Sequence, residues 1–246
     1  MSHRPNLPER TSAVRMLGLL LLVLLGMGAP ARGEQDYVSR YDLFAGYTFL
    51  DSPHVNLFEN GSHFQVGVRP KTWYSLGIDY SISSGSLSLT PNLLTPAVQQ
   101  QLGGLLQQLA LAGQLPAGYV LAVPTNSTTQ TFAGGPQLSY RHFSKVTLFV
   151  RPSFGAIHEV ATPRPGDAVA AVVVGALSPS GHKTDWTAFY GFGGGVDFLF
   201  WKHVGLRVQA DLVYDHLFSD LLQDGRLTTR FSVGPCFNFG RNVRKK

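Results

Sequence analysis

The chain has 246 residues, one cysteine and 14% charged residues, a charged share well below the usual quarter. A single cysteine excludes an internal disulfide framework. The net charge of +5 lies mostly in the first 33 residues and the C-terminal tail, so it does not indicate nucleic-acid binding. No later window offers the roughly 20 continuous apolar residues of a transmembrane helix, and a membrane protein with this sequence would span by strands.

Residues 1–33 have the pattern of a secretory signal peptide. Basic Arg10 and Arg15 precede an apolar run over 17–28, and small residues follow over 29–33. This order matches the three regions of an export signal, and the apolar run is too short to cross a bilayer as a helix. We expect cleavage after Ala31 or Gly33, leaving one domain over 34–246.

The remaining chain alternates apolar side chains with polar or small ones, which predicts β-strands with one apolar and one polar face. Eight segments follow this rule: 41–50, 62–69, 73–83, 127–141, 145–157, 185–200, 203–215 and 226–239. The connections 51–61, 84–126, 158–184 and 216–225 are long, and the others are very short. This order predicts an all-β fold, an eight-stranded antiparallel up-and-down transmembrane barrel with its short turns in the periplasm.

The longest connection, about 84–126, contains a predicted helix. Thr95 and Pro96 suit the N-cap and first helical position, and Gly113 suits the end. Apolar residues recur at helical spacing between them: Val98, Leu102, Leu105, Leu106 and Leu109. The predicted loop helix could cap the barrel mouth, lie on lipopolysaccharide or bind a partner; a packed cap is the simplest expectation.

The polar face of the predicted strands carries Asp and Arg but neither Glu nor Lys. Its charges are Asp42, Asp79, Asp197, Asp211 and Asp215, with Arg69, Arg141, Arg151, Arg207 and Arg230. Arg binds carboxylates in a forked geometry that suits a buried lumen. The other face has no charge across the strand centres, as a lipid-facing wall requires. A soluble barrel with an apolar interior is the alternative.

Aromatic residues gather near the ends of the predicted strands, as in the girdles of membrane barrels. The predicted girdle is Tyr41, Tyr74, Tyr140, Trp186, Tyr190, Trp201, Tyr214 and Phe239.

Three segments carry a family resemblance: Tyr-Asp-Leu-Phe-Ala-Gly-Tyr-Thr-Phe at 41–49, Gly-Phe-Gly-Gly-Gly-Val-Asp at 191–197, and the closing 231–239. The chain resembles the small outer-membrane barrels of OmpA/OmpX type from Gram-negative bacteria. The resemblance implies a bacterial outer-membrane location, contact with outer-membrane lipid and lipopolysaccharide, and insertion by the barrel-assembly machinery. It departs at 240–246, since many such barrels end on the last aromatic residue.

The remaining motifs do not indicate a nucleotide, catalytic or metal site. The glycines at 191–195 lie inside a strand, so a dinucleotide loop is rejected. His142 and Ser144 match the His-x-Ser of outer-membrane lipid A deacylases, but no orienting partner is evident. The eight histidines lack metal-ligand spacing, and no cofactor or metal is expected. Because proline interrupts a sheet ladder, Pro136, Pro152 and Pro235 predict bulges.

The sequence favours a structural or surface-interaction protein whose lumen is plugged by Asp/Arg pairs, with the long loops available to an extracellular partner. A narrow channel or transporter for small solutes and an outer-membrane lipid-modifying enzyme are the alternatives. We expect no enzymatic activity.

Overall fold

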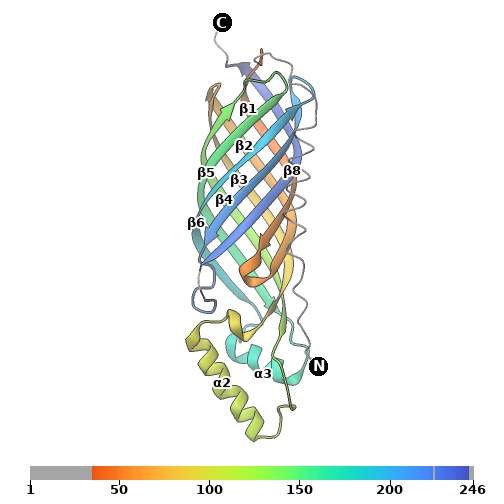
Figure 1. The fold of residues 1–246 in the computed structure, drawn as a ribbon, viewed down its shortest axis with the longest axis vertical. Helices are drawn as coiled ribbons and strands as arrows, with labels where there is room; N and C mark the ends of the chain where they lie inside the picture. The colour runs from red at the N-terminus through yellow and green to blue at the C-terminus, as the bar shows by residue number, and fades with distance from the viewer. Residues whose placement is uncertain (1–34, 224, 244–246) are drawn as a thin grey trace, which may run out of the picture.

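The computed structural model describes residues 35–223 and 225–243; the predicted signal peptide, 1–33, lies outside them. Eight antiparallel strands form a closed barrel in chain order (Figure 1). They are β1 (Ser39–Ser52), β2 (Leu57–Lys71), β3 (Tyr74–Leu89), β4 (Val123–Tyr140), β5 (Val146–Pro163), β6 (Lys183–Leu199), β7 (Val204–Asp215) and β8 (Arg226–Asn242). The predicted fold class is confirmed.

The short connections β2–β3, β4–β5 and β6–β7 all lie at one end, the short-turn end. The other four connections lie at the opposite end, the cap end, and carry the helices α2 (Pro96–Leu111) and α3 (Ala168–Leu177) and two 3-10 turns, η1 (Pro53–Val55) and η2 (Pro91–Leu93). Ser39 pairs with Asn242, so the first and last strands begin and end together at the short-turn end.

The barrel is polar inside and apolar outside. Inward-facing Arg69, Arg207 and Arg230 are at most 2% exposed, whereas outward-facing Ile78 is 69% exposed. The exposed apolar wall, here called the apolar belt, comprises Tyr41, Leu43, Tyr47, Phe64, Val66, Leu76, Ile78, Phe132, Leu138, Leu148, Val150, Phe154, Tyr190, Phe192, Leu212, Phe231, Val233, Phe237 and Phe239. A soluble barrel would have the reverse distribution, so this wall is built to face hydrocarbon.

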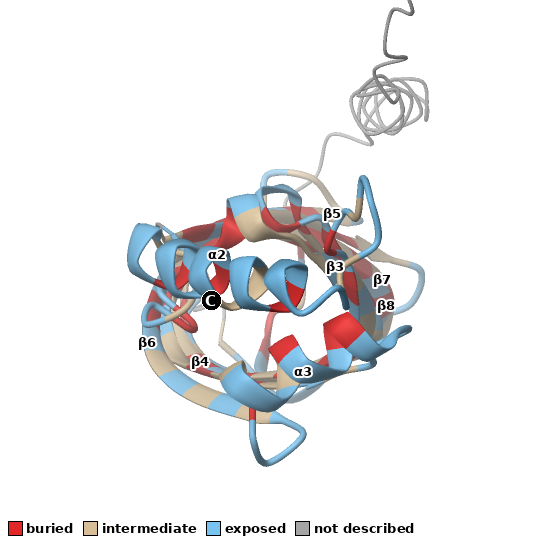
Figure 2. Ribbon diagram, turned by 90° about the horizontal axis from the view of Figure 1, so that it is seen from below, coloured by how far each residue is buried: buried red, intermediate tan, exposed pale blue. Residues whose placement is uncertain are grey.

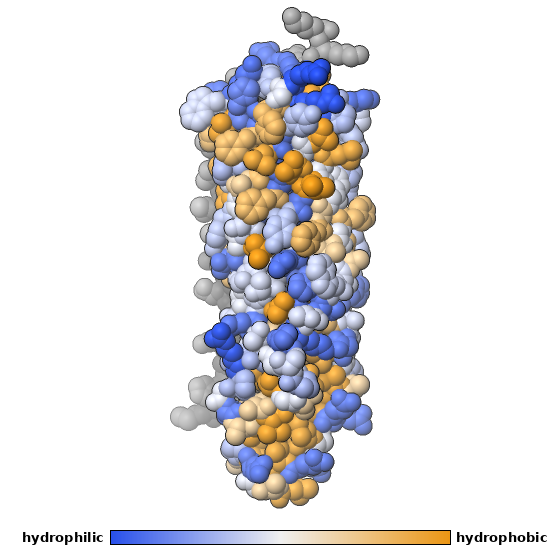
Figure 3. All heavy atoms as spheres, turned by 180° about the vertical axis from the view of Figure 1, so that it is seen from behind, coloured by the Kyte–Doolittle hydropathy of each residue, from blue (hydrophilic) through white to orange (hydrophobic). Residues whose placement is uncertain are grey.

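Several strands run further toward the cap end than their alternation predicts. On β3, the outward residues change from Ile78 and Ile82 to Ser84 and Ser86. The added pairs between β3 and β4 are mostly polar on the outer face, as in the hydrogen bond between the hydroxyls of Ser84 and Thr128 (3.1 Å). Figure 3 shows this change on the surface: hydrophobic residues gather on the barrel wall near the short-turn end and again over the cap, with mainly hydrophilic residues between. The strands therefore project beyond the apolar belt.

The prediction of β-bulges at the three strand prolines is wrong. Register between β4 and β5 is the same before and after Pro136 and Pro152, where only a few pairs of the ladder are missing. Pro235 pairs in register with Leu206. The barrel omits individual ladder bonds at these prolines and keeps its inside and outside faces in phase.

The helices α2 and α3 lie across the barrel mouth (Figure 2). Their shared core contains Leu94, Val98, Leu102, Leu121, Val123, Ala170 and Val173. None of the helices in the described ranges is long and apolar enough to cross a membrane.

Candidate functional site

Buried charged side chains lie in the lumen in three groups that follow one another along the barrel axis. The short-turn group is Asp42, Arg69, Asp197 and Arg207; the central group is His63, Asp79, Arg151, Asp211 and Arg230; the cap-side group is Glu59, Glu159, Asp215 and Arg226. Their positions follow from the strand alternation, which points every second residue inward. All three groups lie at 6% exposure or less.

Arg207 from β7 centres the short-turn group. Its Nε and Nη2 donate to both carboxylate oxygens of Asp197 (2.7 and 2.9 Å), and Nη2 also donates to Asp42 (3.2 Å). Asp42 in turn pairs with Arg69 at 3.3 Å. The Arg207 guanidinium lies 4.9 Å from the ring centroid of Phe149, a cation–π geometry. Two acids and two bases thus neutralise each other here.

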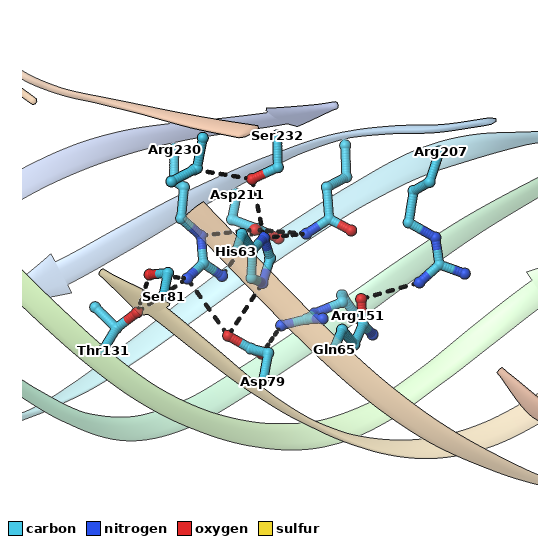
Figure 4. A network of polar contacts seen from close by, with 12 residues as sticks. His63, Gln65, Asp79, Ser81, Thr131, Arg151, Arg207, Asp211, Arg230 and Ser232 are labelled. Atoms are coloured by element: carbon cyan, nitrogen blue, oxygen red, sulfur yellow. Dashed lines mark hydrogen bonds and ion pairs between the residues drawn. The ribbon is translucent and has the colours of Figure 1, made fainter. Parts of the chain in front are cut away.

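The central group crosses the lumen between opposite strands (Figure 4). Arg230 donates to Asp211 (2.9 and 3.1 Å) and to Asp79 (3.4 Å). Asp79 also binds Arg151 from β5 and lies 3.4 Å from Nε2 of His63. Forked, hydrogen-bonded pairs of this kind are the favourable way to hold charge in a dry interior.

Sequence reasoning placed Asp215 of the cap-side group in the lumen and missed Glu59, Glu159 and Arg226. The predicted lumen contained no Glu, but Glu59 and Glu159 point inward at 1% exposure each, and that expectation is corrected. Both lie on strand ends that fall within the connections predicted over 51–61 and 158–184, so they were not assigned to a strand face. Arg226 bridges Glu159 (2.7 Å) and Asp215 (3.3 Å).

Arg141 differs from the other predicted lumen charges. It lies after the end of β4 in the short β4–β5 turn and is half-buried. It donates to the carbonyl of Thr72 (2.9 Å), the hydroxyl of Thr147 (2.9 Å) and the amide oxygen of Gln35 (3.2 Å). It therefore fastens the short-turn end and is held by neutral acceptors.

The predicted girdle residues divide between two levels of the wall. Tyr41 and Phe239 stack at 5.6 Å near the short-turn end, where Tyr74, Tyr140 and Trp201 also lie. Trp186, Tyr190 and Tyr214 lie toward the cap end. Tyr74 and Tyr214 are half-buried, and the other six are exposed.

The predicted loop helix is α2, which begins at Pro96 as predicted and ends at Leu111, two residues before Gly113. Val98, Leu102 and Leu109 are buried, and Leu105 and Leu106 pack partly against the same core. Its partner α3 was missed. Asp167 caps α3 by accepting from the Ala170 amide (2.8 Å) and also accepts from the Tyr119 hydroxyl (3.0 Å). Burial and this hydrogen bond raise the pKa of Tyr119 above its ordinary value.

The glycines of β6 make room for the lumen side chains. A Cβ at Gly193 would lie 1.9 Å from Oδ1 of Asp211, and one at Gly195 would lie 2.7 Å from the Phe149 ring. His142 lies in the β4–β5 turn, where its ring stacks on Tyr140 at 5.9 Å. Among the described residues, no cluster of three or more His, Cys, Asp or Glu side chains could hold a metal ion.

No protein-family model and no curated protein sequence matches this chain. Its structural neighbours are small outer-membrane barrels. Neisserial surface protein A (NspA) has a TM-score of 0.48 and 10% identity over 81% of this chain and 96% of that one. Ail, the attachment invasion locus protein of Yersinia pestis, has a TM-score of 0.44 and 9% identity over 82% and 99%. The outer membrane protein OprG from Pseudomonas aeruginosa has a TM-score of 0.43 and 7% identity over 84% and 99%. At this level of similarity the comparisons describe the fold alone.

Proposed function

We propose that this chain is an integral outer-membrane protein whose barrel is a non-conducting anchor and whose helical cap is an interaction surface outside the cell. The export signal expected at 1–33, the apolar belt and the short turns at one end support this orientation. In it, the wall meets outer-membrane lipid, the cap end meets lipopolysaccharide and extracellular partners, and the barrel-assembly machinery inserts the chain.

One observation supports the proposal that the lumen is closed. Charged side chains bridge opposite walls of the barrel at three successive levels. Arg230 of β8 reaches Asp79 of β3 (3.4 Å), and Arg207 of β7 reaches Gln65 of β2 (2.9 Å). An eight-stranded barrel is only wide enough for its interior to be filled by side chains. A solute would have to separate these pairs to pass, which favours an anchor over a channel.

Single-channel recording tests the closed lumen. The protein with residues 1–33 removed, folded in detergent and checked by its heat-dependent gel shift, should add no steady conductance to a planar bilayer. As a matched control, Arg230→Ser shortens a side chain that crosses the lumen and Lys183→Ser shortens one near the cap; only the first should raise the frequency of conducting events. Steady conductance by the unmodified protein would establish the channel instead.

Labelling of whole cells tests the orientation. A cysteine at exposed Gln107 on α2 should react with a membrane-impermeant maleimide, whereas one at exposed Lys202 in the β6–β7 turn should react only after the outer membrane is opened. Native Cys236 is 1% exposed and serves as the unreactive background. Labelling of Lys202→Cys in intact cells would reverse the proposed orientation.

Replacing residues 90–122 with a short glycine–serine turn between β3 and β4 tests whether this part of the cap binds an extracellular partner. The gel shift must first show that the barrel still folds. Unchanged attachment of the cells to host surfaces or to each other would then remove this part of the cap from the proposal.

A further inference from the structure

A cavity of about 80 Å³ lies between the barrel mouth and the helical cap, separate from the charge pairs that fill the lumen. Its walls come from segments far apart in the chain: the cap-side ends of β3, β4 and β5, both α2 and α3, and the β7–β8 connection. The apolar residues of these walls include Leu87, Leu102, Leu121, Val173, Phe218 and Leu222. The cavity thus exists only because the cap folds back over the barrel.

The roof of this cavity, formed by η2, α2 and the segment before β4, carries no charge; in the side wall, Lys183 at the start of β6 is charged and pairs with Asp220. The sequence has no Asp, Glu, Lys or Arg between Asp79 and Arg141, a stretch that includes η2, α2 and the cap-side half of β4. A polar ligand entering here would lose its water and find few partners, which is unfavourable. The roof therefore selects for apolar molecules.

The floor is formed by Glu159 and Arg226, which also line the cavity. These two side chains bind each other at 2.7 Å, and Arg226 binds Asp215 at 3.3 Å. Their charges are paired with each other and with Asp215, so a ligand in the cavity needs no charged group to neutralise the floor. None of the residues of the central group of lumen charges lines the cavity.

We propose that this cap cavity binds a small, uncharged apolar molecule, no larger than a single aromatic ring or a short alkyl group. Apolar cavities of ~150 Å³ stay free of water and take up benzene or xenon, and this cavity is of the same order. Binding would join the cap to the barrel mouth, because the occupant contacts both. The proposal concerns the cap cavity alone and holds whether or not the lumen conducts.

Methyl NMR of the protein in lipid nanodiscs tests the site with benzene as the probe. Benzene should shift the methyl signals of Leu102, Leu121 and Val173 in a saturable manner that does not depend on the amount of lipid. Leu102→Phe fills the cavity and should weaken the saturable shifts at least ten-fold. Leu111→Phe, on the same helix at 84% exposure, is the matched control and should leave them unchanged.

Three outcomes would overturn the proposal. Shifts that rise without saturation and scale with lipid would mean partition into the bilayer only. Equal loss in both phenylalanine variants would place the probe elsewhere. Cross-peaks from lipid acyl chains to these methyl groups before benzene is added would assign the cavity to a lipid tail. If Leu102→Phe fails the heat-dependent gel shift, Val173→Phe fills the cavity from α3 and takes its place in the same comparison.

Discussion

Truncating Arg207 tests whether the lumen pairs hold the barrel together. Arg207 is fully buried and holds both carboxylate oxygens of Asp197 at 2.7 and 2.9 Å, as well as Gln65 at 2.9 Å and Asp42 at 3.2 Å. In Arg207→Met, Asp42 keeps Arg69, but Asp197 loses its ion pair. Removing one partner of a buried pair typically lowers the free energy of unfolding by about 3–5 kcal/mol, and we expect a loss of that size.

An exposed pair of the same chain provides the matched control. Lys183 and Asp220 pair near the cap with side chains 26% and 66% exposed. Because exposed pairs contribute only ~0.2–1 kcal/mol, Lys183→Met should change the unfolding free energy by less than about 1 kcal/mol. The double variant Arg207→Met with Asp197→Leu should recover most of the loss, since an apolar pair of similar volume often replaces a buried ion pair without penalty.

The assay is equilibrium unfolding in urea of the barrel refolded in lipid vesicles, followed by tryptophan fluorescence and by the gel shift. If Arg207→Met unfolds within about 1 kcal/mol of the unmodified protein, like Lys183→Met, the lumen charges do not stabilise the barrel. If the double variant is as unstable as the single one, the loss comes from packing against Phe149 and not from the stranded carboxylate.

Three further predictions concern the wall and the cap. Ile78→Arg, in the apolar belt, should lower the unfolding free energy by ~2–4 kcal/mol in the vesicle assay, whereas Ser86→Arg, on the same face of β3 beyond the belt, should lower it by at most ~1 kcal/mol; equal effects would misplace the belt. Gly104→Ala on α2 has nothing within 4 Å of the new methyl group, so it should stabilise that helix by roughly 0.5–1 kcal/mol, seen as slower amide exchange in α2; faster exchange would contradict the open surface. Asp167→Ala removes the cap of α3 and should cost that helix about 0.5–2 kcal/mol, with faster exchange of the Ala170 amide and no change in the strands. Exchange that stays slow would show that tertiary packing alone holds α3.

The sequence by itself determined the barrel and its two faces. Alternation with a period of two fixes which residues share a face, and the absence of charge on one face identifies the lipid side, because hydrocarbon does not tolerate an unpaired charge. The helix α2 was equally predictable from the sequence, since Pro96 and the leucine spacing are local signals. These features depend on neighbouring residues alone.

Elements without an apolar alternation or an apolar stripe could not be predicted from the sequence pattern. The helix α3 is a run of Ala, Val, Gly and Leu over Ala168–Leu177, and a helix that is apolar on all sides has no amphipathic period. The strand ends that carry Glu59 and Glu159 mix polar and apolar residues without a regular alternation over enough positions, and they were assigned to connections. In both cases the residues are ordered by what they pack against.

Only the tertiary structure decided which charges meet. Arg207 donates hydrogen bonds to Asp42, Gln65 and Asp197, which lie on three different strands. Arg230 donates to Asp79, which is 151 positions away in the sequence. The register of the strands around the closed barrel sets these distances, and no local pattern encodes that register. For the same reason the cap cavity is a property of the folded chain: its walls come from segments that only the closed barrel brings together.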